Sequence, residues 1–264
     1  MGFFDSVAGT SARAEQNFCD YKDTFEDKPV LISCDVNMID IFPTSSIPVC
    51  VKIQMDAFLD QNSPDLISNA EYSHISSMRN ILTQHLGGRF AGEGIIASQE
   101  SVFLIYYIPQ RMVDTARNML TEGFAGSFRH TDFSISYDPE GESYKKFLYP
   151  TEVQLKQIEN NKILTTLNGY GDDGTEPRTI RFNIIFPNRK AGIDYYTKAA
   201  EKDFEYESME QIPAPAGMVL PRYHLVLKRE LPFDIDLLDL VDEYLIDIAK
   251  PLEGEYKSLE TDIV

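Results

Sequence analysis

The sequence predicts an α+β protein of two domains, each built around an antiparallel sheet. Three observations support this prediction. The chain has 264 residues, which is long for one domain. Segments with apolar residues at every second position alternate with segments whose apolar residues recur every three or four positions. This succession occurs twice, once on each side of the turn-forming stretch DPEGES at 138–143.

The first half begins with a polar segment, residues 1–24, which predicts an N-terminal arm. Strand patterns then lie at 30–36, 49–55, 90–97, 101–108 and 128–137. Helical patterns lie at 70–86 and 111–121, and Gly87 and Gly123 follow them. The segment 101–108, SVFLIYYI, is apolar on both faces and therefore predicts a central strand that is covered on both sides.

The second half begins with a helical pattern at 150–167, for which Thr151 is the expected N-cap. Strand patterns follow at 178–186, 204–207, 218–229 and 255–264, and helical patterns lie at 188–203 and 233–250. In the first of these strands the alternate residues are expected to face the helices: Ile180, Phe182, Ile184 and Phe186.

Each half therefore contains the order strand, helix, strand, strand, helix, strand, which is the split βαβ pattern of the ferredoxin-like fold. We expect two tandem ferredoxin-like domains, at residues 25–141 and 148–264. In such a domain both helices cover one face of the sheet, and the other face is free to receive a partner.

The chain is strongly acidic, with 24 Lys and Arg residues against 42 Asp and Glu residues and a net charge of −18. This charge disfavours a general nucleic-acid binder, because affinity for phosphates comes mostly from Lys and Arg. It also disfavours an anionic membrane surface. No apolar run approaches the roughly 20 residues that span a bilayer, and MGFFDS does not resemble a signal peptide. Gly2 and Ser6 fit a loose acylation pattern. We expect a soluble cytoplasmic protein.

The stretch NGYGDDGTEPRTIRF, residues 168–182, could form a phosphate loop, a metal loop or a turn. A phosphate loop needs a Lys-Ser or Lys-Thr pair after its glycines, and none follows here. A calcium loop needs alternating carboxylates, whereas Asp172 and Asp173 are adjacent. The remaining interpretation is a helix cap at Gly169 or Gly171 and a turn at Gly174.

No catalytic centre, metal site or cofactor is predicted. His74 and His85 share a helix face but lie about 16 Å apart, too far for one metal ion. No G-x-S-x-G nucleophile motif occurs, although a triad from distant positions stays open. Cys19, Cys34 and Cys50 include no C-x-x-C pair, so we expect reduced thiols. A bridge between Cys34 and Cys50 across neighbouring strands stays open.

Two charged surfaces are candidate binding sites. On the helix at 233–250, acidic residues recur at spacings of three and four: Asp236, Asp239, Glu243 and Asp247. They form either a solvated face or a docking stripe for a basic partner. On the open sheet face, two central strands would present cations and a histidine: Arg181, Arg222, His224 and Lys228. This face is expected to be locally basic, and either packs on the first domain or receives an acidic segment. It lacks the aromatic residues that stack RNA bases.

Both halves resemble known families. The positions that carry the first resemblance are Gly171, Asp172, Asp173, Arg178, Gly254, Tyr256, Glu260 and Thr261. Residues 150–264 resemble the regulator of ribonuclease E activity B family (RraB-like), although Leu259 stands where that family has tryptophan and Lys257-Ser258 where it has Asp-Gly. Residues 20–148, which contain YKDTFEDKPVLISCDVN and VFLIYYIP, resemble a bacterial domain of unknown function, DUF695.

The first resemblance implies a non-catalytic protein that binds another protein, which could be an RNA-processing nuclease, and the second implies no known activity. We therefore expect a protein-binding regulator. Its candidate contact residues are Asp172, Asp173, Arg178, Arg181, Arg222, His224, Lys228, Asp236, Asp239, Glu243 and Asp247. One alternative is an enzyme or small-ligand protein with its site in the interdomain cleft, built from Asp172, Asp173, Arg178, Arg181 and His224. The other is a structural or oligomerisation module.

Overall fold

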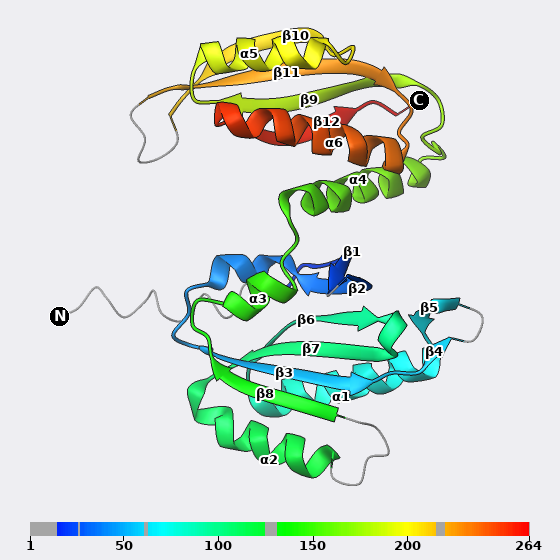
Figure 1. The fold of residues 1–264 in the computed structure, drawn as a ribbon, viewed down its shortest axis with the longest axis vertical. Coiled ribbons are helices and arrows are strands. Elements are labelled where there is room, and N and C mark those ends of the chain that lie inside the picture. Colours follow the sequence, from blue (N-terminus) through cyan, green and yellow to red (C-terminus); the bar gives the residue numbers. More distant parts are fainter. Residues whose placement is uncertain (1–14, 26, 61–62, 125–130, 215–219, 264) are drawn as a thin grey trace, which may run out of the picture. The chain divides into compact units, whose positions relative to one another are not determined.

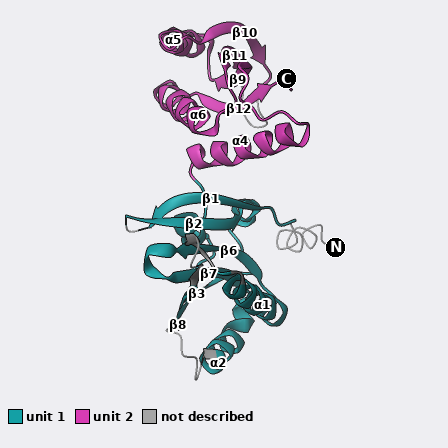
Figure 2. Cartoon of the chain, turned by 90° about the vertical axis from the view of Figure 1, so that its right-hand side faces the viewer, with its two compact units in different colours: residues 1–150 teal, residues 151–264 magenta. Residues whose placement is uncertain are grey.

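The computed structural model describes residues 15–25, 27–60, 63–124, 131–214 and 220–263. The chain divides into two compact units, Met1–Pro150 and Thr151–Val264 (Figure 2). Both units mix helices with an antiparallel sheet, so the α+β class is confirmed (Figure 1). Gly2, Ser6, His130 and the predicted strand ends at 128–130, 218–219 and 264 lie outside the described residues.

The first unit contains a six-stranded sheet in the order β1-β2-β6-β7-β3-β8. Its strands are β1 (Phe18–Phe25), β2 (Lys28–Asp35), β3 (Val49–Asp56), β6 (Arg89–Ile96), β7 (Ser101–Ile108) and β8 (Thr131–Tyr137). Every neighbouring pair is antiparallel. Two short strands, β4 (Leu59–Asp60) and β5 (Ser63–Ile67), pair separately. Short 3-10 turns lie at η2 (Val36–Ile41), η3 (Ala97–Gln99) and η4 (Gln110–Met112).

The helices in the described residues of the first unit are α1 (Asn69–Leu86), α2 (Val113–Phe124) and α3 (Glu142–Phe147). The hydroxyl of Ser68 accepts a hydrogen bond from the amide of Glu71 and begins α1. Gly87, in the left-handed conformation at φ +57°, ends it. α1 and α2 both pack on the face of the sheet that carries the alternate side chains of β3 and β7, among them Ile53 and Leu104. This face holds one hydrophobic core of the unit.

Strand β7 is buried at all eight positions, which confirms its predicted cover on both faces. Leu104 and Tyr106 point toward α1 and α2. Phe103 and Tyr107 point the other way. There the ring of Tyr107 meets Phe42 at a centroid distance of 4.8 Å, and Phe103 meets Phe25 at 6.4 Å.

The N-terminal edge of the first unit differs from the predicted arm. Residues 18–25 form β1, which pairs with β2 along its whole length. Only Cys19 and Tyr21 of this strand are buried, so its amphipathic pattern is too short to stand out in the sequence. The hydroxyl of Tyr21 donates to the carbonyl of Leu148 at 2.7 Å, which joins the first strand to the end of the unit.

The first unit also extends beyond residue 141, which was its predicted end because of the turn-forming stretch at 138–143. Helix α3 belongs to it because Tyr144 is fully buried there. The hydroxyl of Tyr144 donates to the carbonyl of Asp35 at 2.9 Å. Its amide donates to the hydroxyl of Tyr107 at 3.1 Å. Two aromatic residues in ESYKKF anchor this short helix, the buried Tyr144 and Phe147, whose ring lies 5.7 Å from that of Phe25, and the segment is too short to show a periodic apolar pattern.

The second unit contains a four-stranded antiparallel sheet in the order β10-β11-β9-β12. Its strands are β9 (Arg178–Phe186), β10 (Glu205–Ile212), β11 (Arg222–Leu231) and β12 (Glu255–Thr261). Its helices are α4 (Glu152–Gly169), α5 (Arg189–Ala200), α6 (Ile235–Ala249) and the 3-10 turn η5 (Lys250–Leu252). The predicted inward residues of β9, from Ile180 to Phe186, are all fully buried against the helices.

The ends of these elements follow from local chemistry. Thr151 and Gln154 form a capping box at the start of α4, which confirms the predicted N-cap. Strand β10 extends beyond the predicted 204–207. It lies at a sheet edge, where its polar side chains meet water, so most of it lacks an apolar pattern. Across the described parts of the chain, no helix is both long enough and apolar enough to span a membrane.

Candidate functional site

The loop after α4 is shaped by glycines with left-handed backbone conformations. Helix α4 ends at Gly169, and Gly171 follows with φ +86°. The amide of Asp172 donates to the carbonyl of Leu167 at 3.0 Å, which caps the helix. Gly174 has φ +78°, and a Cβ there would lie 2.8 Å from the carbonyl oxygen of Phe233. The predicted cap and turn are therefore confirmed.

Asp172 and Arg178, two of the predicted contact residues, form a buried ion pair inside this loop. Nη2 of Arg178 lies 2.8 Å from Oδ1 of Asp172, and Nη1 contacts Oδ2. Their side chains are only 4% and 2% exposed. The hydrogen bonds to Asp172 raise the pKa of Arg178 above its usual value. This pair ties the loop to the start of β9 and is not on the surface that a partner would contact.

Asp173 is the exposed acid of the same loop. Its Oδ1 accepts hydrogen bonds from the Thr175 hydroxyl at 2.6 Å and the Thr175 amide at 3.0 Å. These bonds lower the pKa of Asp173. The carboxylate therefore organises the turn, while its remaining surface faces water.

The open face of the second sheet is not locally basic, so that prediction is wrong. The three cations and the histidine that were predicted for it all have partners on the same face. Arg181 lies 3.1 Å from Glu207 and 3.6 Å from Asp262, Arg222 lies 2.6 Å from Glu255, and Lys228 lies 3.3 Å from Glu205. Nε2 of His224 lies 2.9 Å from Oδ1 of Asn183.

The carboxylates of these pairs come mainly from the two edge strands, β10 and β12. The prediction considered only the two central strands, β9 and β11. Antiparallel pairing brings edge-strand side chains beside them, as in the register pairs Glu205 with Lys228 and Glu260 with Arg181. The face therefore carries charges of both signs that are joined in ion pairs. It has no excess of positive charge that would attract an acidic segment.

Helix α6 carries a continuous acidic surface. Asp236, Leu240, Glu243 and Asp247 follow one another at spacings of four, three and four, so they share one face of the helix. All four are exposed, and Leu240 is 66% exposed. We call this set the α6 stripe. It places one large apolar side chain among three carboxylates, and it lies on the opposite side of α6 from core residues such as Leu238 and Leu245.

Asp239 was predicted to belong to the acidic face of α6, but it turns toward α4. Burial raises the pKa of Asp239, while side-chain hydrogen bonds from Asn160 and Gln157 of α4 act in the opposite direction. Within the described residues its buried Oδ1 has no hydrogen-bond partner. Asp239 therefore belongs to the contact between the two helices, and the stripe keeps three of the four predicted acids.

A buried polar network lies on another side of α6, where α4 packs on it (Figure 1). Asp242 is fully buried. Its Oδ1 accepts a hydrogen bond from the hydroxyl of Tyr256 at 2.6 Å, and its Oδ2 accepts one from Nδ2 of Asn160 at 2.7 Å. Burial raises the pKa of Asp242 to about 6, and these two donors and the nearby Lys156 limit that rise.

Lys156 completes the network from α4. It is 8% exposed, and its Nζ donates to the carbonyl of Lys257 at 2.5 Å and to Glu159 at 2.6 Å. It also lies 5.6 Å from the centre of the Tyr256 ring. The sequence patterns described above did not predict this network. The available signal was the position of Asp242, four residues after Leu238 and three before Leu245, which places it inside the apolar stripe of the helix.

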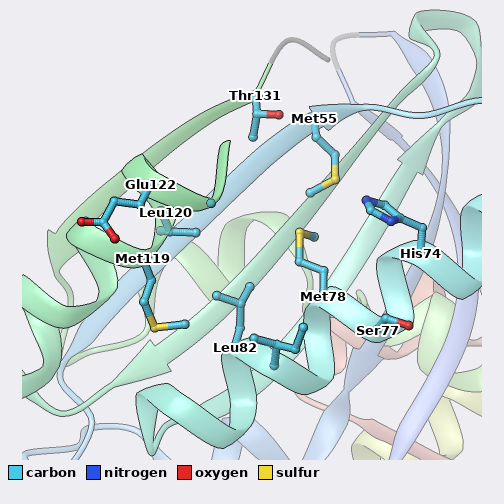
Figure 3. A pocket seen from close by; sticks show the side chains of 11 residues that line it. Met55, His74, Ser77, Met78, Leu82, Met119, Leu120, Glu122 and Thr131 are labelled. Atoms are coloured by element: carbon cyan, nitrogen blue, oxygen red, sulfur yellow. The ribbon is translucent and has the colours of Figure 1, made fainter. Parts of the chain in front are cut away.

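The first unit contains an apolar cavity of about 670 Å³ between α1 and α2 (Figure 3). Three methionines, Met55, Met78 and Met119, converge on it with Leu82 and Leu120. It contains none of the residues that the enzyme alternative required, all of which belong to the second unit. In the described part of the chain, no group of three or more His, Cys, Asp or Glu residues is placed to hold a metal ion.

The three cysteines are buried and unbridged. Cys34 lies on β2 and Cys50 on β3, and two strands, β6 and β7, separate them in the sheet. The disulfide bridge between Cys34 and Cys50 that the sequence left open is therefore excluded, because the two residues are not on neighbouring strands. Cys34 instead lies directly opposite Cys19 of β1.

The comparison with known families gives a match in each unit. Residues 16–149 match the family of unknown function DUF695, which covers about half of the chain. The chain belongs to the DUF695 family. Residues 157–261 match the family described as regulator of ribonuclease activity B. Both resemblances drawn from the sequence are confirmed. The second match contains the Asp172–Arg178 pair, the strands of the open sheet face, the α6 stripe and the Asp242, Asn160 and Tyr256 members of the buried network.

No curated protein matches this DUF695 chain. Among solved structures, an unknown protein from Galdieria sulphuraria is 7% identical, with a TM-score of 0.24. A putative glycine cleavage system transcriptional repressor is 10% identical, with a TM-score of 0.25. Each comparison covers 82% of this chain and 98% of the other. Scores this low support no argument about fold or function.

Proposed function

We propose that this chain is a non-catalytic regulator that binds an RNA-processing ribonuclease through the α6 stripe of its second unit. The observation that carries the proposal is the exposed Leu240 among Asp236, Glu243 and Asp247. The stripe lies within the residues that match the regulator of ribonuclease activity B family. Single exposed apolar residues are common on protein surfaces, so the three carboxylates around Leu240 are what point to a basic partner.

The chemistry of the partner supports the same assignment. A ribonuclease that binds RNA needs a surface rich in Lys and Arg, because most of its affinity comes from neutralising phosphates. A row of carboxylates on a chain of net charge −18 complements such a surface and speeds the encounter. Leu240 then supplies a central apolar contact, and central contacts carry most of the energy at protein interfaces.

Both units are proposed to have the ferredoxin-like arrangement. In the first unit, the element order β3-α1-β6-β7-α2-β8 supports this, together with the sheet order β6-β7-β3-β8. In the second unit the order β9-α5-β10-β11-α6-β12 goes with the sheet order β10-β11-β9-β12. In both, the strands lie in the order second, third, first, fourth. The first unit adds β1 and β2 at the edge beside β6.

The test measures binding of the full-length chain to a purified RNA-processing ribonuclease of the same organism, together with the rate of RNA cleavage. The variant Asp236→Asn/Glu243→Gln/Asp247→Asn is expected to bind at least about tenfold more weakly. It should also lose any inhibition of cleavage. A matched variant with the same change of charge on other exposed positions, Glu201→Gln/Glu210→Gln/Glu253→Gln, should bind like the wild type.

Two results would contradict the proposal. One is equal affinity of the α6 variant and the matched variant for the ribonuclease, which would show that the α6 stripe is not part of the interface. The other is the absence of binding at low salt, where attraction between opposite charges is least screened.

A further inference from the structure

Two cysteine side chains meet across the edge of the first sheet. In the antiparallel register of β1 and β2, Cys19 lies directly opposite Cys34. Directly opposed residues project from the same face of a sheet, with Cα atoms about 4.5 to 5.5 Å apart. Both side chains are buried, at 5% and 0% exposure, and both thiols are unbridged. The two sulfur atoms therefore share one enclosed site.

We propose that Cys19 and Cys34 are a redox modification site, where a reversible disulfide staples β1 to β2. A disulfide requires Cα atoms about 4.4 to 6.8 Å apart, which includes the separation of directly opposed residues. The bond can therefore form by rotation of the two side chains, while the strands keep their register. This inference is independent of the proposed function.

The position of β1 gives the oxidant access. β1 is an edge strand and pairs with β2 alone, whereas β2 is paired on both sides. Edge elements open locally more easily than central strands do. Burial raises the pKa of Cys34 to about 12, with the neighbouring Cys19 adding to the rise. The Cys34 thiol is consequently protonated and enclosed while β1 is closed, and opening of the strand exposes both cysteines to the oxidant.

The oxidant is a low-molecular-weight disulfide. The Cys19 thiolate attacks one sulfur of that disulfide, forms a mixed disulfide and releases one thiolate. The Cys34 thiolate then attacks the Cys19 sulfur, closes the cross-strand bond and releases the second thiolate. In total, the protein thiols lose two protons and two electrons, and the small disulfide is reduced to two thiols. An excess of small thiol reverses both steps.

The disulfide would fix β1 to β2. β1 also contacts the end of the first unit, because the hydroxyl of Tyr21 donates a hydrogen bond to the carbonyl of Leu148. Oxidation is therefore expected to reduce the opening of β1. Cys50 provides an internal control, since it lies on β3 with two strands between it and β2.

The experiment equilibrates the full-length protein with oxidised and reduced glutathione, then alkylates free thiols and measures intact mass and peptide masses. We expect the loss of two hydrogen masses, one remaining alkylated residue, Cys50, and a linked Cys19–Cys34 peptide. A Cys50→Ser variant should still form the link, whereas Cys19→Ser and Cys34→Ser should not. Hydrogen exchange on the wild type, which needs no variant to fold, should slow in β1 on oxidation.

Three results would overturn the proposal. The first is full alkylation of all three cysteines under conditions that oxidise the urea-unfolded chain. The second is a stable glutathione adduct on Cys19 in the wild type without closure. The third is a disulfide that includes Cys50.

Discussion

The hydroxyl of Tyr256 donates a 2.6 Å hydrogen bond to the carboxylate of Asp242, which is fully buried in the second unit. This contact joins the last strand, β12, to α6, and Asn160 adds α4 from the other side of the carboxylate. Lys156, Asp239 and Glu159 are the charged groups that surround it from α4 and α6, and Tyr195 faces it from α5. Because this carboxyl group contacts β12, α6 and α4, its protonation is expected to change the stability of the packing between them.

The Asp242→Asn variant should remove a pH-dependent part of the stability of the second unit. Burial raises the folded-state pKa of Asp242 from 3.8 to about 6. The folded state therefore binds the proton more tightly than the unfolded state does. The resulting stabilisation is fully present below pH 3.8 and is lost as the pH rises through about 6. From that shift we expect a difference on the order of 3 kcal/mol.

Urea unfolding between pH 4 and pH 8 measures this effect as the difference between wild type and variant. The exposed Asp247→Asn on the same helix is the matched control and should leave the pH profile unchanged. Parallel profiles of the wild type and Asp242→Asn would contradict the assignment.

Replacing Arg178 with methionine should destabilise the second unit strongly. The change leaves the carboxylate of Asp172 buried without its cation, and breaking such a pair costs roughly 3 to 5 kcal/mol. Arg181→Met provides a comparison three residues further along the same strand, β9. Arg181 is 36% exposed, and surface pairs of its kind contribute about 1 kcal/mol or less. Equal free energies of unfolding for the two variants would show that the Asp172–Arg178 pair does not hold the loop.

Substitutions at Leu240 should change ribonuclease binding and leave folding intact. The side chain is 66% exposed, so Leu240→Ala removes little buried surface from the core. With Leu240 at the centre of the interface, we expect the same truncation to cost about 1 kcal/mol or more of binding free energy. Isothermal titration measures the binding and urea unfolding measures the stability. Ile193→Ala, another exposed apolar residue on a helix of the same unit, is the control. A loss of stability without a loss of affinity would assign Leu240 to the fold.

The fragment 151–264 should fold without the first unit. Its core is made of its own residues, including Phe182, Phe186 and Leu238. Its leading helix carries its own capping box at Thr151. We expect a dispersed NMR spectrum and a cooperative urea transition that keeps the pH dependence assigned to Asp242. A collapsed spectrum without dispersion would show that residues 1–150 are required for its folding.

Local sequence patterns predicted much of the architecture. The alternation in residues 178–186 identified β9 and its buried side chains, because side-chain direction in a strand repeats every two residues. Thr151 and Gly87 identified the start of α4 and the end of α1, because capping depends on a few adjacent residues. The edge strands β1 and β10 were missed or shortened, since β1 buries only two of its side chains and β10 buries none completely, which leaves little apolar alternation to detect.

The sequence by itself determined the class of fold, the order of most elements and the acidic face of α6, since each depends on neighbours within a few positions. The tertiary structure alone decided which charged side chains are exposed and which are buried or paired within the protein. It buried Asp172 with Arg178, turned Asp239 toward α4, paired Lys228 with Glu205 and placed Cys19 opposite Cys34. These relationships depend on strand register and on helix packing between segments that are distant in the sequence, so the local spacing of residues does not predict them.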